Sequence, residues 1–320
     1  MRRFRRVAGG AVLLALLVSA CGPGASSQSP TPTNSVAGTL VFGGPPECPQ
    51  RPFCLLGLEQ TYGLHFKEFK PLDVGGPITV EALANNEIQV GLLFTSDPTI
   101  KARSFVVLQD DMGLQRADNL VPIINAQLVS DQAVVATLLN SVSAKLSQDA
   151  LVELNRKSTV DHMDAREIAS AWLASEGLVS GANPNAGVGV RPIVVGKTNF
   201  YEQDILSELY AQILEANGFT ATRQDASGSR EVVFPALESG QIDVLPEYAA
   251  TALEFVNGGA GQATADPATT TALLRQALTP KHLTALDPAA AADQNAIVVT
   301  QTTATQYGLT KISDLGKPAP

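Results

Sequence analysis

The 320-residue chain is poor in the residue types that build most catalytic and metal sites. It holds 3 cysteines, 3 histidines and 1 tryptophan, and His65, His162 and His282 lack the spacing of metal ligands. No GxSxG, HExxH or phosphate-loop motif occurs. We therefore expect no metal, no cofactor and no catalysis. An enzyme is the less favoured alternative, since a fold does not dictate a function.

The chain also lacks clustered positive charge and a second long apolar run. Its formal net charge is −9, and no basic cluster follows the opening MRRFRR. Nucleic-acid binding is therefore not expected. After the first 20 residues no apolar stretch of 18 residues occurs, so we expect no membrane-spanning helix.

What is present begins with a targeting signal. Basic residues followed by the apolar run Val7–Ala20 are typical of a signal peptide over residues 1–20, and small residues before Cys21 are typical of a lipobox. This pattern predicts an exported protein that is lipid-anchored through Cys21 to the outer face of the cell membrane. The alternative is an ordinary secretory signal with a stray cysteine. Residues 21–38, rich in Ser, Pro, Thr and Gly, are predicted to form a flexible tether.

The other cysteines, Cys48 and Cys54, lie close together in the sequence ECPQRPFC. Both are expected outside the cytoplasm, where thiols oxidise. We therefore predict a disulfide that closes a small loop. Redox or metal chemistry at this pair is the alternative.

The most informative segment runs from residue 193 to residue 251 and alternates strands with helices. Apolar runs and helical periodicity predict strands at Ile193–Val195, Thr220–Arg223 and Ile242–Leu245 and helices over Glu202–Asn217 and Glu231–Ser239. This alternation is typical of a parallel sheet, in which ligands bind beyond the carboxyl ends of the strands. We therefore expect a small-molecule site in the loops that contain residues 197–200 and 247–251.

The first half of the chain is predicted to have the same α/β character. Its predicted strands are Leu40–Phe42, Phe66–Phe69, Val90–Phe94, Phe105–Leu108 and Val121–Leu128, with helices at Leu55–Tyr62 and Thr79–Asn86. Helical periodicity extends over residues 131–178, and Val179–Pro192 has the Gly, Asn and Pro content of a loop.

Motifs in both halves resemble one protein family. GxxNFxEQ and GSREVxFPALESGxIDxxPEY in the second half, and FGGPPECxxRPxC and LLFTSDPxI in the first, are similar to sequences of the substrate-binding proteins of osmoprotectant ABC importers. Those proteins bind glycine betaine, choline and carnitine. The resemblance implies an α/β, two-lobed fold of the type II periplasmic-binding-protein kind, with a ligand cleft between the lobes.

The order of the halves differs from that of the family, because the segment that usually opens the mature protein comes second here. A circular permutation accounts for this order, with the family's termini joined through residues 179–192. A fragment of a tandem duplication is the alternative. The resemblance then implies one lobe of residues 39–120 plus 296–320 and another of residues 121–295.

The resemblance also implies which side chains hold the ligand. Tyr248 matches a tyrosine of the aromatic cage around a quaternary ammonium group, and Phe94 lies where another cage residue is usual. Thr251 matches a side chain near the ligand's carboxylate, and Arg51 an arginine that reaches across the cleft. The alternatives are structural: a loop-pinning salt bridge for Arg51, a half-buried ring for Tyr248 and a core strand position for Phe94.

Some positions depart from the family pattern. Thr198 stands where the family has a lysine, and tyrosines are expected at Asn295 and at Asp118 or Asn119. Each lost aromatic face weakens the binding of a quaternary cation by about 0.5–2 kcal/mol. Because Asn199, Asn295 and Asp118 suit hydroxyls, amides or imidazole-type cations, we expect a more polar solute than glycine betaine.

The function implied is that of a monomeric solute-binding lipoprotein. It would capture a small osmoprotectant-like solute, such as a betaine, choline, carnitine or ergothioneine-like compound, and deliver it to an ABC permease and its ATPase. Ligand contacts from both lobes would favour a closed state that the permease recognises. The alternative from another class is a ligand sensor or surface interaction lipoprotein without a transport role.

Overall fold

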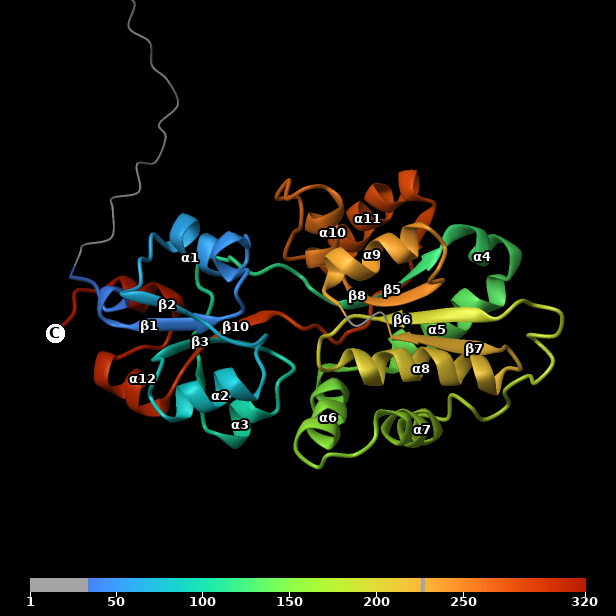
Figure 1. Cartoon of the computed structure of the whole chain (residues 1–320), viewed down its shortest axis with the longest axis horizontal. Coiled ribbons are helices and arrows are strands. Elements are labelled where there is room, and N and C mark those ends of the chain that lie inside the picture. The colour runs from blue at the N-terminus through green and yellow to red at the C-terminus, as the bar shows by residue number, and fades with distance from the viewer. Residues whose placement is uncertain (1–33, 226–227) are drawn as a thin grey trace, which may run out of the picture. The chain divides into compact units, whose positions relative to one another are not determined.

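The computed structural model describes residues 34–225 and 228–320, which contain two five-stranded sheets with helices packed against them (Figure 1). The predicted α/β fold class is confirmed. The predicted signal peptide, the predicted lipid-anchored Cys21 and most of the predicted tether lie outside the described residues. Within the described part of the chain, no helix has the length and apolar character needed to cross a membrane.

The first sheet has the strand order β2-β1-β3-β10-β4. In this sheet β1 pairs in parallel with β2 and β3, whereas β10 runs antiparallel to β3 and β4. The strands are β1 (Val41–Gly44), β2 (Glu68–Pro71), β3 (Val90–Phe94), β4 (Val106–Val107) and β10 (Asn295–Val299), and the helices of this part of the chain are α1 (Leu55–Tyr62), α2 (Pro77–Ala84), α3 (Thr99–Ala102) and α12 (Gln301–Tyr307).

The second sheet has the order β7-β6-β8-β5-β9. Here β6 is parallel to β7 and β8, and β5 is antiparallel to β8 and β9. The strands are β5 (Leu120–Asn125), β6 (Ile193–Lys197), β7 (Ala221–Asp225), β8 (Val244–Tyr248) and β9 (Leu283–Ala285). The helices are α4 (Ala126–Asp131), α5 (Ala133–Lys145), α6 (Gln148–Thr159), α7 (Ala165–Ser175), α8 (Gln203–Ala216), α9 (Arg230–Glu238), α10 (Ala249–Val256) and α11 (Pro267–Leu278).

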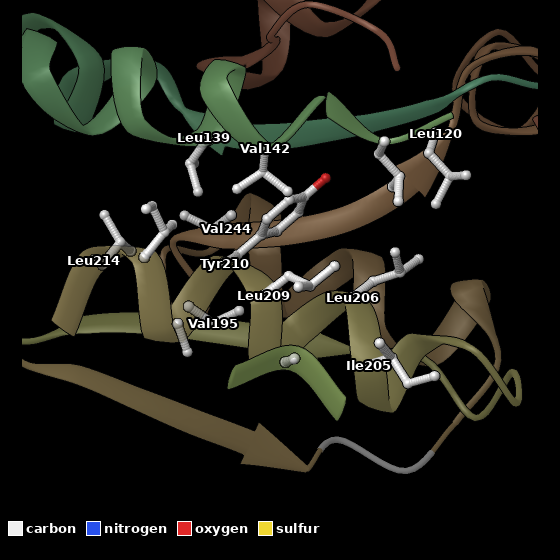
Figure 2. Packing of buried hydrophobic residues seen from close by; sticks show 14 of the residues in the cluster. Leu120, Leu139, Val142, Val195, Ile205, Leu206, Leu209, Tyr210, Leu214 and Val244 are labelled. Carbon is white, nitrogen blue, oxygen red and sulfur yellow. The ribbon is translucent and has the colours of Figure 1, made fainter. Parts of the chain in front are cut away.

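Helix α8 is held by the apolar face that its periodicity predicts. Ile205 and Leu209 are buried, and Figure 2 shows Tyr210 of α8 beside Val142 of α5 and Val244 of β8. Trp172 of α7 belongs to the same core cluster. Burial of apolar side chains stabilises a fold by about 25 cal/mol for each Å² of apolar surface removed from water. The packed face of α8 therefore holds this helix in place, and with it the loop that precedes the helix.

The parallel pairing predicted for the strands of residues 193–251 is confirmed for β6, β7 and β8. The strands β5 and β10 are antiparallel to their neighbours, so each sheet as a whole is mixed. Some local expectations are wrong. The strand predicted to reach Leu128 ends at Asn125, whose side chain accepts a hydrogen bond from the backbone N–H of Gln127 (2.9 Å) and so starts helix α4. Strand β8 extends to Tyr248, so Glu247 lies in a strand and not in a loop.

The boundaries of the two sheets differ slightly from the predicted lobes. Leu120 belongs to the second sheet and Asn295 to the first, one residue away from the expected boundaries in each case. The predicted tether, residues 21–38, also extends into residues that belong to the fold. Val36 and Ala37 are buried in the core of the first sheet, because the chain is already paired with its C-terminal segment at that point.

The start of the described chain lies beside its end. The backbone N–H of Val36 donates to the carbonyl oxygen of Lys317 (2.8 Å), and that of Ala319 donates to Asn34 (2.7 Å). The strand orders of the two sheets also correspond position by position. In each sheet the fourth strand, β10 or β5, is antiparallel to its neighbours and comes from the other half of the chain. These contacts are the ones that a permuted order requires, since ends that can be rejoined must be adjacent.

A chain opened within residues 179–192 and joined from residue 320 to residue 34 by a short Gly-Ser linker should therefore fold to the same structure. We expect its circular dichroism spectrum to match and its Tm to change by no more than about 5 °C, equivalent to about 1–2 kcal/mol. A control opened between Leu209 and Tyr210 of α8 should not fold. An unfolded or aggregated rejoined chain would contradict the permuted arrangement.

Candidate ligand-binding site

A cavity of about 620 Å³ lies where segments of the two sheets face one another. This volume is in the range of small-molecule sites, roughly 300–1,000 Å³. Residues from both halves of the chain line it. Every side chain singled out for ligand binding in the sequence is among them: Arg51, Phe94, Asp118, Thr198, Asn199, Tyr248, Thr251 and Asn295.

One wall of the cavity is aromatic. Phe94, at the end of β3, packs edge-on against Phe200 with ring centroids 4.7 Å apart, and Phe200 packs edge-on against Tyr248 at 5.8 Å. All three rings line the cavity, whereas Tyr201 packs behind Phe200 at 4.4 Å. The sequence interpretation missed Phe200, although this residue lies inside the GxxNFxEQ motif. The wall therefore offers one more aromatic face than expected.

The ring of Tyr248 is fixed by a buried carboxyl group behind the wall. Its hydroxyl donates to Oε1 of Glu202 (2.6 Å), while Oε2 of Glu202 accepts from Asn155 (2.7 Å) and Ser96 (2.9 Å). Glu202 is fully buried, and this burial raises its pKa above the usual range. Because Ser96 follows β3 and Asn155 lies in α6, this network also ties the two sheets together behind the cavity.

An ion pair between Arg230, the first residue of α9, and the buried Glu247 lines the cavity. The Arg230 guanidinium donates to both carboxylate oxygens of Glu247 (2.8–3.1 Å) and to the hydroxyl of Thr251 (2.8 Å). Burial acts to lower the pKa of Arg230, but the Glu247 carboxylate raises it above its ordinary value. Thr251 is therefore engaged by Arg230, a residue that sequence interpretation missed. The available signal was the presence of Glu247 and Thr251 four residues apart, on either side of the point where β8 meets α10.

Asp118 closes the N-terminus of α10. Its Oδ1 atom accepts from the backbone N–H groups of Ala250 (2.8 Å) and Thr251 (3.0 Å), which a helix leaves without partners. Burial raises the pKa of Asp118 to about 6, against the opposing effects of the Thr251 N–H and the Arg230 charge. This carboxyl group thus titrates near the physiological range.

Asp293 and Asn295 line the same end of the cavity. Oδ1 of Asp293 accepts from the backbone N–H of Ser96 (3.1 Å), and the side-chain amide of Asn295 donates to the carbonyl oxygen of Phe53 (2.8 Å). Burial, and next the nearby Glu202, raise the pKa of Asp293 well above its usual range. Asp293 is a further residue that the sequence interpretation did not select.

Arg51 reaches the cavity from the loop between Cys48 and Cys54. Its guanidinium lies 3.0 Å from Glu47 in the same loop and 3.8 Å from Glu231 of α9, and its side chain is 41% exposed. The contact with Glu47 is the loop-pinning salt bridge foreseen as the structural alternative. The contact with Glu231 joins this loop to the opposite side of the cavity.

The predicted disulfide between Cys48 and Cys54 is present in the structure. Replacing both cysteines by serine should lower the free energy of unfolding by about 2 kcal/mol, the value for so short a loop. Since the loop presents Arg51, ligand affinity should fall as well. Thermal melting with and without reductant measures the first effect, and an unchanged Tm in reductant would contradict it.

Thr198 and Asn199 line the cavity from the turn between β6 and α8. The backbone N–H of Thr198 donates to the Gln203 side chain (3.3 Å) and that of Asn199 to Gly228 (3.0 Å). Lys197 does not line the cavity, and its ammonium group pairs with Asp204. Lys197 comes one position before Thr198, where the family has a lysine. Because Lys197 does not line the cavity, it is not placed to substitute for that lysine.

The charged lining of the cavity is mainly acidic. Its positive side chains are Arg51 and Arg230, and both already contact carboxylates. The acidic side chains that line it are Glu47, Asp118, Glu231, Glu247, Glu254 and Asp293. Within the described part of the chain, no group of His, Cys, Asp or Glu side chains is placed to hold a metal ion. Aromatic faces with excess negative charge are suited to an organic cation.

Comparison with known proteins identifies the relatives of this chain. A family model described as the substrate-binding domain of the ABC-type glycine betaine transport system matches residues 29–175 and 191–320. The unmatched residues between these two parts, 176–190, overlap the loop of residues 179–192 that is predicted to join the family's termini.

Individual relatives match over a shorter length. The glycine-betaine-binding protein of Pseudomonas aeruginosa is 25% identical over 151 residues, 47% of this chain and 48% of that protein. The glycine betaine-binding protein YehZ of Escherichia coli is 23% identical over 145 residues, 44% of this chain and 48% of that protein. The chain thus spans about half the length of these relatives. A solved ancestral arginine-binding protein bound to arginine aligns with 87% of this chain and 91% of its own, at 15% identity and a TM-score of 0.40.

Proposed function

This chain belongs to the family of substrate-binding domains of ABC-type glycine betaine transport systems, and we propose that it captures a small organic cation in the cavity described above. The observation that carries the proposal is the composition of the lining. Phe94, Phe200 and Tyr248 offer aromatic faces, and the carboxylates outnumber the arginines. Such a lining attracts a cation and repels an anion.

The proposal includes delivery of the solute to an ABC permease. Segments of both sheets contribute to the cavity wall, so a bound solute would contact both and favour the arrangement in which they are close. A permease that recognises this arrangement would distinguish the loaded protein from the empty one. No catalytic step is required.

The proposal places the protein outside the cytoplasm, anchored by lipid on Cys21. The basic and apolar opening of the sequence supports export, and the residues before Cys21 support lipidation. Metabolic labelling with a fatty-acid analogue should label the wild-type chain and not the Cys21→Ser variant. Equal labelling of both would contradict the anchor.

A thermal-shift screen of the purified protein tests solute capture. The panel should contain glycine betaine, choline, carnitine, ergothioneine and polar amines, with anionic metabolites as controls. A ligand present at a hundredfold excess over its Kd should stabilise the protein by about 2.7 kcal/mol, which raises the Tm by several degrees. The proposal would be overturned if anions raised the Tm and no cation did.

A further inference from the structure

The acceptor-rich end of the cavity consists of Asp118, Asp293 and Asn295. Asp118 is 6% exposed and Asp293 5% exposed, so both carboxyl groups are largely removed from water. Neither forms an ion pair with a described arginine or lysine; Arg230 influences Asp118 only through its charge. Buried carboxylates without a paired cation are costly. Glu254, another buried carboxylate of the lining, differs in that backbone N–H groups reach both of its oxygens.

The backbone hydrogen bonds to these carboxyl groups converge on one oxygen of each, and the side chains of Thr251 and Ser96 add hydrogen bonds to Asp118 and Asp293 respectively. The backbone donors Ala250 and Thr251 reach Oδ1 of Asp118, and the backbone N–H of Ser96 reaches Oδ1 of Asp293. Asn295 donates one amide N–H to Phe53 and keeps its acceptor Oδ1 and a second N–H. These three side chains are therefore richer in acceptors than in donors.

A ligand fills such a site well only if it brings hydrogen-bond donors. A fully methylated ammonium group has a positive charge but no N–H, so it would cover the carboxylate oxygens without satisfying them, and an unsatisfied buried acceptor weakens binding. An ammonium, guanidinium or imidazolium group supplies both the charge and the N–H donors.

Resting on the proposed capture of organic cations, we propose that this protein selects a cation that carries N–H donors over its fully N-methylated counterpart, with Asp118 and Asp293 accepting its hydrogen bonds. The aromatic rings of Phe94 and Phe200 would cover the apolar part of the same group. Burial raises the pKa of both aspartates, and Glu202 raises that of Asp293 further, which agrees with carboxyl groups that a bound cation would stabilise in their charged form.

Calorimetric titration with matched pairs tests the selectivity. The pairs are ethanolamine and choline, glycine and glycine betaine, 4-aminobutyrate and its trimethyl derivative, and histidine and its trimethyl betaine. For each ligand pair that binds, we expect the member with N–H groups to have a Kd at least tenfold lower than its methylated counterpart, a difference of about 1.4 kcal/mol. Equal or tighter binding of the methylated member would overturn the selectivity while leaving cation capture intact. If no member of any pair bound, the proposed capture itself would fall, and the selectivity with it.

Variants assign the selectivity to the two aspartates. Asp118→Asn and Asp293→Asn keep an Oδ1 acceptor for the backbone N–H groups, so circular dichroism melting should show folded proteins. Each should reduce the preference for the N–H member by at least threefold. The control Asp149→Asn, at an exposed position of α6, should leave the preference unchanged. An unaltered preference in both pocket variants would overturn the assignment.

Discussion

Replacing Arg230 by alanine is expected to lower the free energy of unfolding by about 3–5 kcal/mol, the cost of leaving a buried charge without its partner. Glu247 is 1% exposed and accepts hydrogen bonds to both oxygens from Arg230. Without the guanidinium, this carboxylate keeps, among donors in residues 34–225 and 228–320, only the backbone N–H of Tyr248 at 3.1 Å. Urea denaturation followed by circular dichroism measures the loss as a lower midpoint.

A double variant separates the lost charge pair from lost packing. Replacing Arg230 by methionine and Glu247 by glutamine removes both charges, keeps similar volumes and leaves an acceptor for the N–H of Tyr248. We expect it to recover more than half of the lost stability, because removing both members of a buried pair is often nearly neutral. The exposed pair of Arg103 and Glu81 serves as a control, and Arg103→Ala should change the midpoint little. A similarly small change in Arg230→Ala would contradict the structural role of the pair.

The second large effect is a dependence of cation affinity on pH. Asp118 has a pKa of about 6 in the empty protein, and that of Asp293 is raised well above its usual range. A bound cation favours the ionised carboxylates, so binding releases protons and the affinity rises with pH. Between pH 7.5 and pH 5 we expect the Kd to increase by about tenfold for Asp118 alone, and further through Asp293.

The stability of the empty protein should change in the opposite direction. The carboxyl groups with raised pKa values hold protons more tightly in the folded state than in the unfolded state, so acidification through pH 6 favours folding. The charged groups that face Asp118 are Arg230, Glu247 and Asp293, and Glu202 faces Asp293. Melting curves between pH 7.5 and pH 5 should show the empty protein gaining Tm while a permanently charged ligand loses its stabilising effect. Asp118→Asn should flatten both trends, and an affinity independent of pH would contradict the role of these carboxylates.

The sequence predicts elements well where local pattern decides them. Helix α8 and the strands β3 and β6 follow directly from apolar periodicity and from glycine or polar boundaries. The sheet position and antiparallel direction of β5 and β10 do not follow from local pattern, because each pairs with strands from the other half of the chain. Pairing over such separations leaves no local signal. The capping side chain of Asn125 was readable, since Asn is a preferred residue at a helix start.

The cavity lining was predicted in part, for a similar reason. Tyr248 and Arg51 belong to recognisable sequence motifs, so each could be predicted as a lining residue without knowledge of its neighbours in space. The roles of Arg230 and Asp293 depend on partners that the fold supplies: Glu247 for Arg230, and the backbone of Ser96 for Asp293. Phe200 contributes a face only because the turn before α8 places it between Phe94 and Tyr248. Arrangement in three dimensions, and not residue type, distinguishes these side chains from ordinary ones.

Calorimetric titration of the purified protein and its Phe200→Ala variant with the tightest cation from the screen tests the central claim most directly. Phe200 contacts both other rings of the aromatic wall, so its removal should weaken the cation site without removing a charge. We expect one cation per chain and a Kd at least tenfold higher in the variant, about 1.4 kcal/mol. Saturable binding with the same Kd in both proteins would contradict the claim that this cavity holds the solute.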